Sequence, residues 1–170
     1  MTFAQLSAIF EHVNFERQII GFDTFSGFPN FSPIDKKHAG KLATKGAYGI
    51  DSFNDLKECI KLYDSNRFLE HLPKVQLVKG DASKTIPKYV ENNPGLVVSL
   101  LYLDFLLYKP TKIALQNFVP RMPQGSLLVF NLVNEKHWPG PTKALMDTLD
   151  ITKLEFKRFP FSPYLHYVVL

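Results

Sequence analysis

The 170-residue chain has a single cysteine, Cys59, and therefore forms no disulfide within itself. It lacks any run of about 18 apolar residues that could span a membrane, and its N-terminus lacks the basic-then-apolar order of a secretory signal. Its 20 Lys and Arg residues are scattered rather than gathered into a basic stripe, so nothing supports nucleic-acid binding. These absences predict a cytoplasmic protein without a membrane or nucleic-acid partner.

Apolar residues are abundant by contrast, at 45% of the chain, and 15 of them are Phe. A chain of this length and composition can bury one sizeable core, which predicts a single domain over residues 1–170. We interpret most of the aromatic side chains as core residues.

Short apolar runs alternate with helical patterns along the chain. This alternation predicts an α/β fold with a Rossmann-like, doubly wound, mostly parallel sheet and a C-terminal antiparallel hairpin. Strands are expected at residues 18–22, 75–79, 96–103, 126–131, 154–159 and 165–170, and helices start at Thr2, Ser52, close to Pro87, at Pro110 and at Thr142.

Three local features sharpen this outline. Thr2 and Gln5 have the spacing of a capping box, and apolar residues recur at helical intervals as far as Val13, so the first helix is expected to extend that far. Residues 25–48 are rich in Gly, Pro and Lys and are expected to form a loop. Pro87 is expected in the first turn of its helix.

Polar residues follow four successive predicted strands: Asp23, Asp81, Asp104 and Asn131. In open α/β sheets ligands bind beyond the carboxyl ends of the strands, so these side chains predict a pocket. The alternative is that each Asp only caps the helix or turn that follows it.

The motifs at these strand ends resemble the macrocin O-methyltransferase family. The resemblance is carried by Gly-Phe-Asp-Thr-Phe-Ser-Gly-Phe-Pro at 21–29, Lys-Gly-Asp at 79–81, Tyr-Leu-Asp at 102–104, Lys-Pro-Thr at 109–111, Pro-Arg-Met-Pro at 120–123 and Trp-Pro-Gly at 138–140. It implies a class I methyltransferase that uses S-adenosylmethionine and Mg²⁺ to methylate a sugar or related hydroxyl of a small-molecule acceptor. A homo-oligomer is compatible with it.

The resemblance also implies roles for individual residues. The carboxylate of Asp23 is expected to accept hydrogen bonds from the cofactor ribose, and Asp81, Ala82 and Ser83 are expected beside the adenine. The full set expected to bind the cofactor is Asp23, Thr24, Phe25, Asp81, Ala82, Ser83 and Asp104.

The sequence departs from the family at the reaction centre. Leu106 stands at the position where the family usually has a candidate catalytic base, so the catalytic residue is unknown. Of the expected metal ligands, Asp104 is retained, while Asn131 and Leu132 replace two acids. This degenerate site predicts impaired transfer; the alternative is a noncatalytic cofactor-binding or interaction module.

A second departure concerns the first strand. The family places a glycine-rich segment and a central strand before the helix at Thr2, and no residue here supplies them, so we expect an N-terminally truncated domain. The strand that ends at Asp23 should then either pair directly with the strand that ends at Asp104 or be separated from it by a gap.

Overall fold

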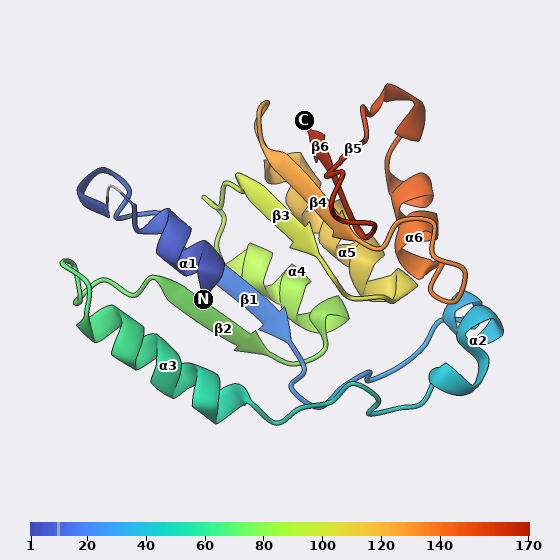
Figure 1. Ribbon diagram of the computed structural model, residues 1–170, viewed down its shortest axis with the longest axis horizontal. Helices are drawn as coiled ribbons and strands as arrows, with labels where there is room; N and C mark the ends of the chain where they lie inside the picture. Colours follow the sequence, from blue (N-terminus) through green and yellow to red (C-terminus); the bar gives the residue numbers. More distant parts are fainter. Residues whose placement is uncertain (10) are drawn as a thin grey trace.

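Two β-sheets form the centre of the molecule in the computed structural model, which describes residues 1–9 and 11–170 (Figure 1). β1 pairs with β2, and β3 with β4, in parallel, whereas β6 runs antiparallel to both β4 and β5. The predicted α/β architecture with its C-terminal antiparallel hairpin is confirmed. The strands are β1 (Ile19–Asp23), β2 (Val75–Lys79), β3 (Leu100–Leu103), β4 (Leu127–Asn131), β5 (Lys157–Arg158) and β6 (Leu165–Val169).

Of the two outcomes predicted for β1 and β3, direct pairing or a gap, the structure has the gap. These strands belong to separate sheets, one with the order β1-β2 and the other with the order β3-β4-β6-β5. Each of the two strands is thus paired along only one edge among the described residues. The ladder of β3 begins at Leu100 rather than at residue 96, which leaves a shorter strand than the apolar run predicted.

Helices connect the strands. Three of them pack together, since α5 (Tyr108–Phe118) contacts both α4 (Ala82–Asn92) and α6 (Gly140–Thr148) (Figure 1). None of the helices in the described part of the chain is both long and apolar enough to cross a membrane. The α-helices are α1 (Thr2–Ser7), α2 (Pro33–Ala39), α3 (Phe53–Ser65), α4 (Ala82–Asn92), α5 (Tyr108–Phe118) and α6 (Gly140–Thr148); 3₁₀ turns lie at Glu11–Val13, Gly40–Leu42, Val119–Arg121 and Ile151–Lys153.

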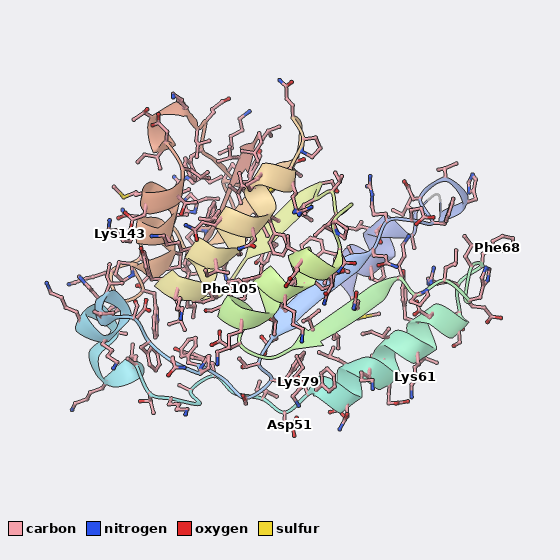
Figure 2. All side chains as sticks on the ribbon, turned by 180° about the vertical axis from the view of Figure 1, so that it is seen from behind. Asp51, Lys61, Phe68, Lys79, Phe105 and Lys143 are labelled. Carbon is pink, nitrogen blue, oxygen red and sulfur yellow. The ribbon has the colours of Figure 1, made fainter. Side chains whose placement is uncertain are left out.

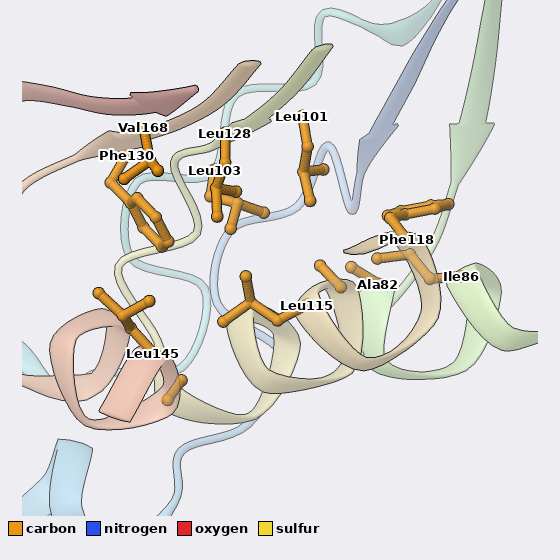
Figure 3. Packing of buried hydrophobic residues seen from close by; sticks show 12 residues of the cluster. Ala82, Ile86, Leu101, Leu103, Leu115, Phe118, Leu128, Phe130, Leu145 and Val168 are labelled. Carbon is orange, nitrogen blue, oxygen red and sulfur yellow. The ribbon is translucent and has the colours of Figure 1, made fainter. Parts of the chain in front are cut away.

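The main core lies between the larger sheet and helices α4, α5 and α6 (Figure 3). Leu128 and Phe130 of β4 are fully buried and face Leu115 of α5, which is also fully buried. Burying side chains of this size contributes about 1.5–3 kcal/mol each. Phe22 of β1 packs against the same cluster, with its ring centroid 5.7 Å from that of Phe118 of α5, so the helices join the two sheets through side-chain packing.

The N-terminal helix differs from its prediction. α1 ends at Ser7 and its N-cap is Met1, without a side-chain cap, so the predicted capping box is wrong. Leu6 and Val13 are 58% and 68% exposed, so their burial contributes little that would extend so short a helix. Phe10, which belonged to the same predicted pattern, lies outside the described residues.

Two further expectations are corrected. Residues 25–48 are not all loop, because α2 forms within them; Ser32, Pro33 and Asp35 supply a capping box and a proline in the first turn. Pro87 lies in the interior of α4 rather than in its first turn, because the helix already begins at Ala82 after the capping residue Asp81.

Candidate functional site

Three of the four strand-end residues line one cavity of about 230 Å³. Asp23, Asp81 and Asp104 reach it from β1, from the turn after β2 and from the turn after β3, respectively. The backbone keeps the first two close, since the Gly80 N–H donates to the Asp23 carbonyl at 2.8 Å. Asn131 reaches the site indirectly, by donating from Nδ2 to Asp104 Oδ1 at 2.8 Å. The convergence predicted for these residues is therefore observed.

Asp23 is held by the turn that follows β1. Its Oδ1 accepts a hydrogen bond from the Phe25 N–H at 2.6 Å, and Phe25 has a positive φ of 56°. Thr24 Oγ1 donates to the Gly27 carbonyl at 2.7 Å, which closes the turn. Asp23 Oδ2 accepts no hydrogen bond from the described residues, so one oxygen of this strand-end carboxylate is available to a ligand.

Gly27 fixes this turn against the other half of the same segment. Its φ is +78°, and a Cβ there would stand 2.3 Å from the Gly46 carbonyl oxygen. Backbone hydrogen bonds from Phe28 to Ala47 and from Gly46 to Phe28 hold the two halves together at 3.1 and 3.0 Å. Residues 25–50 thereby form one wall of the cavity, which we call the pocket wall.

Asp81 serves as a helix cap as well as a cavity residue. Its Oδ1 accepts from the Ser83 N–H at 2.9 Å at the start of α4, so the capping alternative holds for this residue. Ala82 lines the cavity, whereas Ser83 does not. Phe25 lines a neighbouring, more open cavity of about 360 Å³ together with Asp51 and Lys79, both labelled in Figure 2.

Asp104 is solvent-accessible, yet its carboxyl is partly desolvated beside the apolar residues that follow it. This desolvation raises the pKa of Asp104, and the hydrogen bond from Asn131 opposes the rise. The next residues, Phe105 and Leu106, also line the cavity (Figure 2 labels Phe105). Of the four cavity residues from Asp104 to Leu107, Asp104 is therefore the charged one.

Leu106 has a positive φ of 60°, and so does Leu132, at 67°, after β4. The left-handed region is unfavourable for a leucine and is better tolerated by Asn, Asp or Gly. Both leucines thus occupy backbone positions better suited to short polar residues. They are also the positions at which the family resemblance led us to expect acids.

The residues present do not fit a Mg²⁺ ion. Asn131 turns its amide nitrogen toward Asp104, so the pair forms a hydrogen bond rather than presenting two oxygens to a cation. Glu135 accepts from the N–H groups of His137 and Trp138 and is thereby kept in its own loop. The described part of the chain contains no cluster of three or more His, Cys, Asp or Glu side chains suited to a metal.

Sequence reasoning missed a second apolar cluster beside the cavity. Leu107 and Trp138 are 2% and 5% exposed, and Ala39 of α2 is buried with them. Phe28 of the pocket wall packs on Trp138, with ring centroids 5.3 Å apart. Only the capping signal of Ser32 and Asp35 could have revealed the helix that completes this cluster.

Comparison with known proteins yields matches among solved structures; no protein-family model and no curated protein matches. A crystal structure of CalS11, a calicheamicin methyltransferase, aligns with a TM-score of 0.91 and 33% identity over 99% of this chain. The apo structure of CalS11, described as TDP-rhamnose 3'-O-methyltransferase, aligns with a TM-score of 0.78 and 31% identity over 99% of this chain.

The O-methyltransferase NovP aligns with a TM-score of 0.71 over 98% of the chain; at 16% identity this likeness concerns the fold alone. The chain spans 66%, 65% and 65% of the lengths of these three structures, respectively. It therefore has the Rossmann-like fold of class I methyltransferases and is similar in sequence to a sugar O-methyltransferase.

Proposed function

We propose that this chain is an S-adenosylmethionine-dependent O-methyltransferase of the macrocin type, acting on a hydroxyl of a sugar or related small molecule. The observation that carries the proposal is the convergence of Asp23, Asp81 and Asp104 on one cavity, in a chain similar to CalS11 over nearly its whole length. Since CalS11 is described as acting on TDP-rhamnose, a nucleotide-linked sugar is the acceptor class to test first.

The cavity residues fit the cofactor in chemistry and order. Asp23 Oδ2 would accept from a ribose hydroxyl, while Thr24 and Phe25 hold the turn that presents it. Asp81 and Ala82 at the start of α4 would lie beside the adenine, and Ser83, which does not line the cavity, would act through the hydrogen bond from its N–H to Asp81. When bound, the cofactor supplies an electrophilic methyl group, and Asp104 would stand nearest to the reacting end.

Transfer by this chain is proposed to be slow. An acceptor hydroxyl must lose its proton during methylation, and a positioned general base contributes about 100- to 10,000-fold to such a step. Leu106 cannot accept a proton, and Asn131 and Leu132 supply no charge to replace it. Because the site does not fit Mg²⁺, the chain's own residues offer only positioning and the single carboxylate of Asp104.

Titration calorimetry with S-adenosylmethionine, with Mg²⁺ and with a chelator, tests this function. We expect one binding site with the same affinity in both conditions, and only slow methyl transfer to TDP-rhamnose. Failure of the cofactor to bind would refute the proposal. Rapid, Mg²⁺-dependent transfer would agree with the proposed O-methyltransferase function but would refute the proposal that methyl transfer is slow.

A noncatalytic cofactor-binding or interaction module is the second candidate, and the leucines at positions 106 and 132 favour it. It predicts cofactor binding without any transfer, even after hours with a range of sugar hydroxyls. Mass spectrometry of the acceptor distinguishes the two candidates, because a single methylated product identifies the enzyme.

A further inference from the structure

Asp35 is a completely buried carboxylate at a place no strand-end pattern indicates. It lies in the first turn of α2 at 0% exposure, and the described residues give it no ion-pair partner. Its Oδ2 accepts from Ser32 N at 3.0 Å and from Ser32 Oγ at 2.5 Å. Its Oδ1 accepts from Tyr108 N at 3.0 Å, across 73 residues of chain. One side chain thus binds the N-termini of both α2 and α5.

The N-terminus of α6 closes the same junction from a third side. A Cβ added to Gly140 would stand 2.5 Å from Asp35 Oδ1 and 2.5 Å from Tyr108 N. The φ of Gly140 is not positive, so its backbone conformation does not require a glycine. The close approach of Asp35 and Tyr108 does. Three helix N-termini therefore meet around a single carboxylate.

This junction connects two of the segments that line the cavity. Asp35 belongs to the pocket wall, which contributes Phe28 and Tyr48 to the cavity. Tyr108 directly follows Leu106 and Leu107, which line the cavity from the β3 turn. The hydrogen bond between Asp35 and Tyr108 N is a polar link between these two walls, beside the apolar contacts of Trp138.

We infer that Asp35 is a positioning residue for the ligand pocket: its carboxylate sets the separation between the pocket wall and residues 106–107. The inference rests on the proposed function for the identity of the ligand, but not for the existence of the junction. A carboxylate that merely caps α2 would need only Ser32, and the bond to Tyr108 is additional to the cap.

Trp138 gives this inference a direct readout. It is the one tryptophan of the sequence and is 5% exposed in the cluster that α2 completes. Asp35→Asn keeps an oxygen for Tyr108 N but places an amide nitrogen against the Ser32 N–H donor. Gly140→Ala leaves the carboxylate intact and disrupts its contact with Tyr108 by steric overlap. Both variants should shift Trp138 emission to longer wavelength in the folded protein.

Asp150→Asn is the matched control, because Asp150 also caps a helical turn, at Thr152 N, but lines neither cavity. We expect unchanged emission and unchanged S-adenosylmethionine affinity for this control, and about tenfold weaker affinity for both junction variants. The double variant Asp35→Asn with Gly140→Ala should be no weaker than the worse single variant. If a junction variant does not fold, Ser32→Ala provides the milder change, with the same direction of shift.

Wild-type emission and affinity in the folded junction variants would overturn the inference, as would an equal effect of Asp150→Asn. A wild-type chain that binds no S-adenosylmethionine would refute the proposed function alone. The emission of the ligand-free variants then still decides whether Asp35 sets the junction.

Discussion

At the scale of single residues, the expected reaction centre has one retained carboxylate, Asp104, with neutral residues around it. Asp104 has a raised pKa because of partial desolvation, and its partner Asn131 donates a neutral hydrogen bond. A raised pKa in the folded state means that the ionised carboxylate lowers the stability of the fold. That loss is absent below the pKa of the unfolded chain, near 4, and complete above the pKa of the folded state.

Asp104→Asn should therefore increase the free energy of unfolding at pH 7, by less than about 1 kcal/mol because Asp104 is exposed to solvent. The gain should vanish below pH 4, where the wild-type carboxyl is protonated in both states. Urea unfolding at pH 7 and pH 3.5 measures it. Asp150→Asn is a control with the opposite expected sign. Hydrogen bonds from Thr152 and Lys153 lower the pKa of Asp150, so its ionised carboxylate stabilises the fold and the variant should be less stable at pH 7. A loss of stability in Asp104→Asn at pH 7 would contradict the account.

Leu106 allows a test of the missing base. Leu106→Asp places an acid on a left-handed backbone that tolerates Asp better than Leu, and it should accelerate methyl transfer by at least about 100-fold. Leu106→Asn is the control, since it has the same size and backbone preference but cannot accept a proton. Initial rates with TDP-rhamnose compare the two. Equal acceleration by Asn would mean that backbone relief, not base catalysis, is responsible.

At the scale of elements, backbone contacts hold the two halves of the pocket wall together. Gly27 approaches Gly46 so closely that no side chain fits between them. Gly125 has a similar φ of +87°, but nothing lies within 4 Å of where its Cβ would be. The two glycines therefore separate the effect of conformation from the effect of space.

Gly125→Ala should lower stability by about 1–2 kcal/mol, the conformational cost alone. Gly27→Ala should have a larger effect, more than about 3 kcal/mol or local detachment of residues 25–50, because overlap is added to strain. Thermal unfolding together with limited proteolysis of the pocket wall measures both. Similar losses in the two variants would show that the close contact between Gly27 and Gly46 is unimportant.

The elements also show how far sequence reasoning reached. β2 was predicted to the residue and β1 within one, because short apolar runs bounded by polar residues produce a strong local pattern. The α1 capping box was wrong, because a six-residue helix depends on packing that a local motif does not encode. The role of Asp35 could not be foreseen either. Its partner Tyr108 lies 73 residues away, and only the fold brings the two together.

At the scale of the whole molecule, two separate sheets share one layer of helices and present their strand ends to one cavity. The packing of α4 and α5 under both sheets explains how Asp23 and Asp104 lie together although β1 and β3 are not paired. This arrangement, together with the similarity to CalS11, supports a site built for the methyl donor of an O-methyltransferase.

The most direct test of this claim is the affinity of Asp23→Asn for S-adenosylmethionine, measured by calorimetry. The variant keeps the oxygen that accepts a hydrogen bond from Phe25 N, so the turn is retained. It replaces Oδ2 with an amide nitrogen, which cannot accept a hydrogen bond from a ribose hydroxyl. Asp55→Asn, an exposed change in the first turn of α3, is the control. We predict that Asp23→Asn binds at least about tenfold more weakly, or about 1.4 kcal/mol, while Asp55→Asn binds as the wild type does. Equal affinity of Asp23→Asn and wild type would contradict the account.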